Sequence, residues 1–163
     1  MKRVACLCLL VACTSDRTGD FLAAWRADLS AMISRDCNDT APASRMVAGV
    51  FDIVNPSEGT IVVSGLANGI WFEPDACMPL PFDVEESTAT IRAGTTCTRT
   101  TTETDRMETW TFSFSSLTLT LDGAGTQVTM AGGGSSSMMC TGAACPVAMQ
   151  TCDWQFSGTA TKL

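Results

Sequence analysis

The chain has 163 residues, with ten basic residues against 17 acidic ones, a formal net charge of −7 and no histidine. Its lysines and arginines form no cluster, which argues against a nucleic-acid partner and against electrostatic docking on anionic lipid. The absence of histidine excludes Ser-His-Asp and Cys-His catalysis, and the length fits one domain with a sizeable core.

At the N-terminus, two basic residues precede a nine-residue apolar run from Val4 to Ala12. The run is too short to span a bilayer as a helix, but it is typical of the hydrophobic part of a signal peptide. Its end, LVAC at Leu10–Cys13, resembles the lipobox of bacterial lipoproteins. The resemblance implies cleavage before Cys13 and acylation of that cysteine, with two or three acyl chains forming a stable membrane anchor.

This interpretation divides the chain into a signal peptide at 1–12, a lipidated tether at 13–19 and one β domain at 20–163. It predicts a lipid-anchored protein of the bacterial cell envelope. Ser15 stands where an aspartate would hold an enterobacterial lipoprotein at the inner membrane, which favours the outer membrane. The alternatives are an ordinary cleaved signal peptide, or a buried strand with chance cysteines.

The segment DFLAAWRADLSAMISR, at 20–35, is predicted to form an amphipathic helix. Asp20 can cap its N-terminus, and its apolar residues recur at helical spacing. These residues are Phe21, Leu22, Trp25, Leu29, Met32 and Ile33. We expect this stripe to pack on the domain rather than to bind a partner.

Beyond the helix, the apolar pattern has a period of two, as in strands with one buried face. Strands are predicted at 46–54, 60–66, 70–73, 88–93, 96–104, 108–114, 117–121, 126–131 and 152–161. The apolar residues of 108–114 and 117–121 are out of phase, so a tight turn or a bulge is expected at Ser115–Ser116. Asn68-Gly69 is expected to form a hairpin turn, and GGGSSS at 132–137 a flexible loop.

These elements predict an all-β antiparallel meander, either a small barrel or a sandwich, with one N-terminal amphipathic helix. The stretch 117–130 resembles hairpins of the small lipocalin-like barrel domains of bacterial lipoproteins, which favours the barrel. Large side chains on the inward face favour a filled core over a ligand cavity. They are Phe51, Val63, Trp71, Trp110, Phe112, Leu119, Val128 and Trp154.

Of nine cysteines, Cys6 and Cys8 would leave with the signal peptide, and Cys13 would carry the lipid. The other six fit a three-disulfide framework in an oxidising compartment. They are Cys37, Cys77, Cys97, Cys140, Cys145 and Cys152. Among the possible pairs we prefer Cys140–Cys152, because both cysteines flank predicted strand ends. The spacings fit neither a zinc site nor a C-x-x-C redox motif.

The acidic stretch EPDACMPLPFDVEE, at 73–86, is expected to be a solvated loop. One alternative is calcium binding through Asp83, Glu85 and Glu86, although the spacing of an EF-hand is absent. Another is hydrolysis by two facing carboxylates, drawn from Asp75, Asp83, Glu85 and Glu86. Because no nucleophile with a base is recognisable, we expect no catalysis and no cofactor.

The sequence therefore predicts a non-catalytic envelope lipoprotein whose rigid domain binds an unknown protein or glycan, or acts as a scaffold, at the membrane surface. Two alternatives stay open. One is a carrier of a small hydrophobic ligand inside a lipocalin-like barrel, and the other is a carboxylate-dependent hydrolase of envelope polysaccharide.

Overall fold

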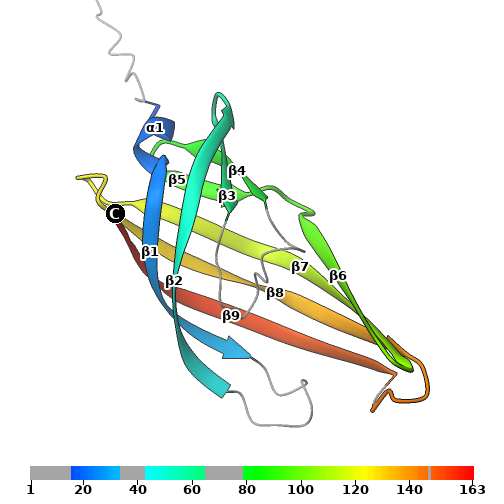
Figure 1. The fold of residues 1–163 in the computed structure, drawn as a ribbon. Helices are drawn as coiled ribbons and strands as arrows, with labels where there is room; N and C mark the ends of the chain where they lie inside the picture. Colours follow the sequence, from blue (N-terminus) through cyan, green and yellow to red (C-terminus); the bar gives the residue numbers. More distant parts are fainter. Residues whose placement is uncertain (1–15, 34–42, 65–78, 147) are drawn as a thin grey trace, which may run out of the picture.

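The computed structural model describes residues 16–33, 43–64, 79–146 and 148–163. These residues form one antiparallel sheet of nine strands and one short helix near the N-terminus (Figure 1). The elements are α1 (Thr18–Phe21), β1 (Ala23–Ile33), β2 (Ala43–Ser57), β3 (Thr60–Ser64), β4 (Leu80–Glu85), β5 (Thr88–Ile91), β6 (Thr96–Glu103), β7 (Arg106–Leu121), β8 (Gln127–Thr141) and β9 (Met149–Lys162).

The sheet closes on itself. Its strand order is β5-β4-β3-β2-β1-β9-β8-β7-β6, and an additional pairing joins β5 to β7. The long strand β7 serves two neighbours along one edge, because its C-terminal part pairs with β5 and its N-terminal part with β6. The predicted all-β antiparallel meander is confirmed, and the ring closure makes it a barrel arrangement rather than a sandwich of two sheets.

The two ends of the ring differ in what they hold. At one end, here called the closed end, α1 packs beside the β7–β8 turn and the C-terminus. Arg17 Nη1 donates to the Asp122 carbonyl at 3.2 Å, and Lys162 Nζ donates to the Asp20 carbonyl at 2.9 Å. The β6–β7 turn and the β8–β9 loop lie at the opposite, distal end (Figure 1).

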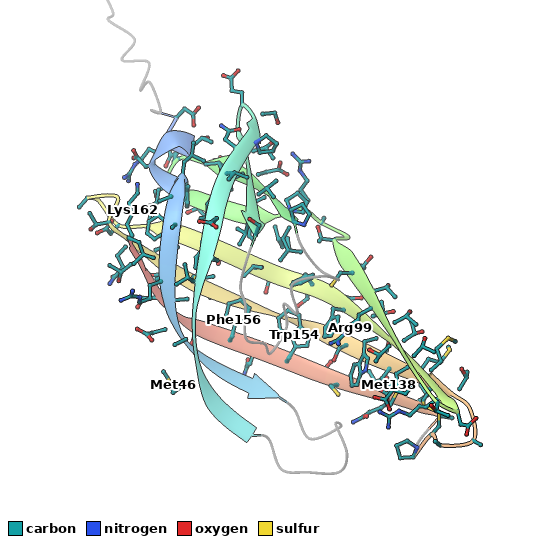
Figure 2. The ribbon with its side chains drawn as sticks, in the orientation of Figure 1. Met46, Arg99, Met138, Trp154, Phe156 and Lys162 are labelled. Carbon is teal, nitrogen blue, oxygen red and sulfur yellow. A yellow bond between two sulfur atoms is a disulfide. The ribbon has the colours of Figure 1, made fainter. Side chains whose placement is uncertain are left out.

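The core fills the interior near the closed end. The side chains of Phe21, Trp25 and Phe51 are fully buried there. Trp25 Nε1 donates to the Phe21 carbonyl at 2.8 Å, and Lys162 Nζ lies 5.5 Å from the centroid of the Trp25 ring. Figure 2 shows Lys162 at this end of the molecule. A buried indole whose N–H is bonded is the arrangement that stabilises a tryptophan inside a core.

The prediction of the inward face is confirmed for the residues that the structure describes. Phe51, Val63, Leu119, Val128 and Trp154 are buried, Phe112 packs against the core, and Trp110 is half-buried. Trp71 lies outside the described residues.

The helix predicted at 20–35 is wrong in extent. Only Thr18–Phe21 is helical, and the chain then continues as β1 between β2 and β9. In β1, Trp25 and Ala27 are buried while Arg26 between them is exposed. The small inward alanines conceal this period of two when only large apolar residues are counted. Pairing on both sides outweighs the helical propensity of the segment.

The folded domain also begins earlier than the predicted boundary at residue 20. Thr18 is buried, and its hydroxyl and backbone N–H donate to the Asp16 carboxylate. Together with the bond from Arg17 to the β7–β8 turn, these contacts make residues 16–19 part of the domain rather than of a tether.

Two segments predicted as loops are strands. The residues of GGGSSS, at 132–137, continue β8 and pair with β7 on one side and β9 on the other. Within the acidic stretch, Leu80–Glu85 forms β4, which buries Leu80 and Phe82. In contrast, an irregularity was expected at Ser115–Ser116, either a tight turn or a bulge, and a register shift in the β7–β8 pairing shows that it is a bulge. The predicted strand at 70–73 and the turn at Asn68-Gly69 lie outside the described residues.

Candidate binding groove

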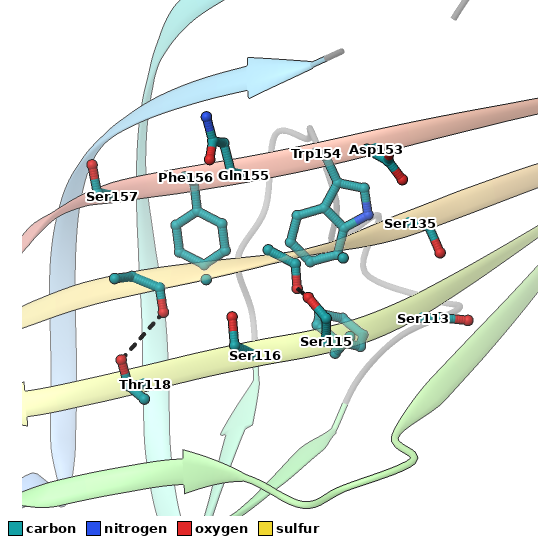
Figure 3. A pocket seen from close by; sticks show the side chains of 15 residues that line it. Ser113, Ser115, Ser116, Thr118, Ser135, Asp153, Trp154, Gln155, Phe156 and Ser157 are labelled. Carbon is teal, nitrogen blue, oxygen red and sulfur yellow. Dashed lines mark hydrogen bonds between the residues drawn. The ribbon is translucent and has the colours of Figure 1, made fainter. Parts of the chain in front are cut away.

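An open groove with a volume of about 960 Å³ crosses β7, β8 and β9 midway between the closed and distal ends (Figure 3). Its polar lining comes from all three strands, namely Ser113 and Ser115, Ser135, and Asp153, Gln155 and Ser157. On β9 these side chains alternate with buried Trp154 and Phe156. Because successive side chains of a strand point to opposite faces, the groove lies on the outer face of the ring.

Three glycines of β8 form the floor of the groove. Gly133 shares the outward face with the polar lining, and it leaves the backbone uncovered there. Gly132 and Gly134 face inward, where they are paired with Phe156 and Trp154. A Cβ atom on Gly134 would lie 2.6 Å from Trp154 Cζ2, and one on Gly132 would lie 2.9 Å from Phe156 Cε1. The two rings therefore lie across β8 and take the space of the missing side chains, as Figure 3 shows.

The layer behind the groove is held by aromatic contacts and by the bulge. The Trp154 ring meets Phe114 edge-to-face at 5.4 Å and stacks on Phe156 at 6.2 Å between centroids. On the outer face, Ser115 Oγ in the bulge donates to the Gly133 carbonyl at 2.8 Å. Since this bond links β7 to the glycine floor, the groove is built from fixed strands rather than from loops.

The chemistry of the groove is that of a hydrogen-bonding surface. Hydroxyl groups and the Gln155 amide can each donate and accept, and Asp153 supplies one carboxylate. Among the residues that the structure describes, no lysine or arginine lines the groove that could act as a base toward a serine. The arrangement can hold a polar ligand, but it contains no nucleophile with an activating partner.

The sequence analysis missed this groove. The alternation of Trp154 and Phe156 with Asp153 and Gln155 gave the correct inward and outward faces of β9. The sequence did not show that glycine-rich β8 pairs with β9. In this pairing, aromatic rings of β9 cover the inward glycines of β8.

The carboxylates considered for catalysis and for calcium lie elsewhere, on β4 and the turn after it. Asp83 Oδ1 accepts from Arg92 Nε at 2.8 Å, and Arg92 also donates to Thr60 Oγ1 at 2.9 Å. Glu85 and Glu86 are exposed. Within the described part of the chain, no three His, Cys, Asp or Glu side chains are grouped so that they could hold a metal ion. The structure therefore does not bring Asp83, Glu85 and Glu86 together as a ligand set, and Asp75 lies outside it.

The preferred disulfide Cys140–Cys152 is wrong, because Cys140 is bonded to Cys145. Cys152 is paired in register with Ser136, four residues before Cys140 on β8. Four residues of strand span about 13 Å, which exceeds the roughly 7 Å between Cα atoms that a disulfide can bridge. Cys97 and Cys152 are disulfide-bonded as well. The candidates Cys37 and Cys77 lie outside the described residues.

Two aspartates at the closed end have pKa values lowered by hydrogen bonds. Backbone N–H groups of Gln127 and Thr126, at 3.1 and 2.8 Å, donate to Asp122 Oδ1 and lower the pKa of that carboxyl. The hydroxyl and N–H of Thr18 lower the pKa of Asp16 in the same way. Both carboxylates fix turns of the closed end, and neither lines the groove.

Comparison with protein-family models, with curated proteins and with solved structures finds no match for this chain. Among the described residues, no helix has the length and apolar character needed to cross a membrane. The lipobox at Leu10–Cys13 precedes the described residues, so lipidation of Cys13 stays a prediction from the sequence.

Proposed function

We propose that the protein is a non-catalytic, lipid-anchored binding protein of the bacterial cell envelope, and that it binds a neutral stretch of glycan in the groove on β7, β8 and β9. The observation that carries the proposal is the groove itself, a cavity of about 960 Å³ lined with hydroxyl, amide and backbone groups on rigid strands. Binding sites built on strands hold their ligands more reproducibly than sites on loops.

A glycan matches this lining better than the other ligands considered. Sugar hydroxyls donate and accept hydrogen bonds, as the serines and Gln155 do, and an uncharged saccharide needs no basic side chain. A stable protein partner would need roughly 800 Å² per side with an apolar centre, whereas the groove is smaller and its lining mixes hydroxyl, amide and aromatic groups. The interior near the closed end is packed, which favours an outer-surface site over a carrier cavity there.

The position of α1 fits anchoring through Cys13. The first described residue, Asp16, follows Cys13 by three positions and belongs to the closed end. A lipid on Cys13 would therefore keep the closed end next to the membrane. On β7 the lining lies three to eight residues before Leu121 at the closed end, about 10–26 Å at roughly 3.3 Å per residue, so the groove would lie outside the headgroup layer but close to it.

The groove is tested with a matched pair of substitutions on β8. Full-length lipoprotein in detergent micelles is applied to an array of envelope polysaccharide fragments, and bound fragments are titrated by calorimetry. Ser135→Trp fills the groove and should abolish binding. Ser137→Trp puts the same ring on the same face two residues outside the lining, and it should leave binding intact. Equal affinities of the two variants, or no bound glycan with the wild type, would reject the glycan site. Release of shortened fragments would instead favour the hydrolase.

The anchor is tested separately with Cys13→Ala in an expressing bacterium. The wild type should incorporate labelled palmitate and fractionate with the outer membrane, and the variant should do neither. If the variant stays with the membrane and the wild type takes up no label, the protein is not a lipoprotein.

A further inference from the structure

The outer face of β2 carries a row of exposed apolar side chains. Met46, Val50 and Val54 are 74%, 44% and 52% exposed, and Ala48 is exposed as well (Figure 2). Because outward side chains of a strand recur at every second residue, these four positions and Asp52 form one continuous row. We call these five residues the β2 stripe. From Met46 to Val54 the stripe is about 26 Å long at roughly 3.3 Å per residue.

The stripe contrasts with the outer face elsewhere on the ring. On β9, the outward positions from Thr151 to Thr161 are threonine, serine, glutamine or aspartate. The stripe and the groove lie on different sides of the ring, because β1 and β9 separate β2 from β8 in one direction, and β3, β4, β5 and β7 separate them in the other. An exposed apolar patch is typical of an interaction surface. The stripe is therefore a candidate for contact with an apolar partner on the side away from the groove.

A second copy of the chain fits the stripe poorly. If both copies were anchored in one membrane, a two-fold axis would run along the strands. Each residue of the stripe would then face its own counterpart, and two Asp52 carboxylates would meet. An axis across the strands would put the two N-terminal ends on opposite sides of the dimer. A single row of side chains is also far narrower than an interface of roughly 800 Å² per side.

A lipid surface fits the stripe better, because a convex wall touches a flat bilayer along a narrow strip. Apolar side chains at such a contact lie at the boundary between headgroups and acyl chains. The charged residues beside them suit headgroups that carry both signs. Arg26 and Asp28 of β1 are exposed and pair with residues of the stripe, and Asp52 lies within it. Arg26 can meet a phosphate group, and the two carboxylates can meet ammonium groups.

The proposed anchor brings the stripe to the membrane. This step rests on the lipidation of Cys13, which belongs to the proposed function. Cys13 precedes Asp16 by three positions, and three residues of extended chain reach about 10 Å. Next to Val54, Ile53 pairs with Ala23, which follows α1 closely. The stripe therefore starts beside the anchored end, and the rest of it meets the bilayer when the ring leans toward β2.

We propose that the β2 stripe seats the protein on a lipid surface of zwitterionic headgroups. Its four apolar side chains lie at the headgroup boundary, and the groove faces away from the membrane. The acyl chains on Cys13 supply the membrane binding, whereas the stripe determines which wall of the ring faces the bilayer. This orientation keeps the groove open to a glycan.

The orientation is tested on the wild type in bicelles of phosphatidylcholine that contain a small share of a gadolinium-chelating lipid. The protein is labelled with ¹³C at the methionine methyl groups, and the relaxation that gadolinium adds to each signal is measured. The added relaxation should be several-fold larger at Met46 than at Met139 and Met149. These two are the matched controls, because they are 58% and 69% exposed but lie on β8 and β9.

Substitutions test the stripe itself. In vesicles of brominated phosphatidylcholine, the fluorescence of Val50→Trp should be quenched more strongly than that of the wild type, because bromine quenches an indole at the headgroup boundary. Thr129→Trp puts the same ring at an exposed outward position of β8 outside the groove, and its quenching should match the wild type. Val50→Asp should reduce the gadolinium effect at Met46 while the protein stays with the vesicles.

Flotation with the same vesicles separates failure of the anchor from failure of the seat. The seat alone is overturned if the wild type floats but gadolinium acts equally on the three methionines, or if Val50→Trp is quenched no more than Thr129→Trp. If the wild type does not float, the anchor of the proposed function fails, and the seat is overturned with it.

Discussion

At the closed end most side chains that point into the ring are buried. Toward the distal end the small inward residues are buried as well, but the large rings of Trp110 and Phe112 keep part of their surface in solvent. Trp25 at the closed end bonds to the Phe21 carbonyl at 2.8 Å, inside the core. Trp110 stacks on Phe112 at 6.3 Å between centroids, and its Nε1 lies 3.4 Å from Glu108 Oε2. The same residue type thus has a core environment at one end and a half-exposed one at the other.

This difference indicates how the fold is stabilised. Burial of apolar surface dominates near α1, where β1, β2 and β3 bring in Trp25, Phe51 and Ile61. The distal parts of β6 to β9 have a hydroxyl-covered outer face, and they depend more on strand pairing and on covalent links. The candidate groove lies between these two regions, on β7, β8 and β9.

The largest expected effect comes from removing a tryptophan at each end. Trp25→Ala should lower the free energy of unfolding by about 3–5 kcal/mol, because it empties a fully buried site. Trp110→Ala should lower it by only about 1–2 kcal/mol, because the ring is half-buried. Urea unfolding of the purified protein measures both values. If Trp25→Ala does not fold, Trp25→Phe keeps a six-membered aromatic ring but loses the indole N–H and part of the buried volume, and it should lose about 2–3 kcal/mol. Equal losses at Trp25 and Trp110 would remove the distinction between the ends.

The next effect concerns the glycines between the two ends. Gly134→Ala should lower the free energy of unfolding by about 2–3 kcal/mol, because its Cβ meets the Trp154 ring at 2.6 Å and the Ser113 carbonyl. Gly133→Ala is the matched control on the outward face, where the nearest atom is the Trp154 carbonyl oxygen at 3.2 Å, and its loss should stay below about 1 kcal/mol. Thermal unfolding of the two variants measures both losses. A milder effect at Gly134 than at Gly133 would mean that the rings do not cover the strand as described.

The sequence pattern predicted those features that depend on neighbouring residues. The change of phase between 108–114 and 117–121 predicted a tight turn or a bulge at Ser115–Ser116, and the structure has the bulge. The sequence pattern gave wrong predictions where pairing with strands distant in the sequence determines the secondary structure. Residues 23–33 carry both a helical and an alternating pattern, and only the pairing with β2 and β9 selects the strand. Gly132 and Gly134 are covered by the rings of Phe156 and Trp154, which lie 24 and 20 residues further along the chain.

The candidate groove could not be predicted from the sequence for the same reason. The groove needs the register of three strands together with a bulge. A scan of the sequence for motifs contains no information on strand register.

A smaller effect is expected for the disulfide of the distal end. Cys140 and Cys145 are separated by five positions, and closing so short a loop stabilises by about 2 kcal/mol in the chain-entropy model. The Cys140→Ser/Cys145→Ser variant should lose this much or less. Amide hydrogen exchange should rise in the β8–β9 loop, above all at Ala144, whose N–H donates to the Asp105 carbonyl at 3.2 Å. Exchange at Trp25 in the closed end should not change. A rise there would show that the two ends unfold together.

The smallest effect concerns the pH dependence of the closed end. Hydrogen bonds from the Gln127 and Thr126 N–H groups lower the pKa of Asp122 below its usual 3.8. A carboxyl with a lowered pKa holds its proton more weakly in the folded protein than in the unfolded chain. Its stabilisation is therefore complete above the usual value, and it is lost as the pH falls through the lowered pKa. Asp122→Asn should be slightly less stable than the wild type at pH 7, and the difference should disappear in acid.

Melting temperatures between pH 2 and 7 measure this difference. Gln127→Ala is the control, because it alters a side chain and keeps the backbone N–H that donates to Asp122 at 3.1 Å. It should follow the pH profile of the wild type. The β7–β8 turn also accepts a bond from Arg17, so the loss in Asp122→Asn should be accompanied by faster amide exchange in α1 and not at the distal end. A pH-independent difference between Asp122→Asn and the wild type would show that the carboxylate charge does not fix this turn.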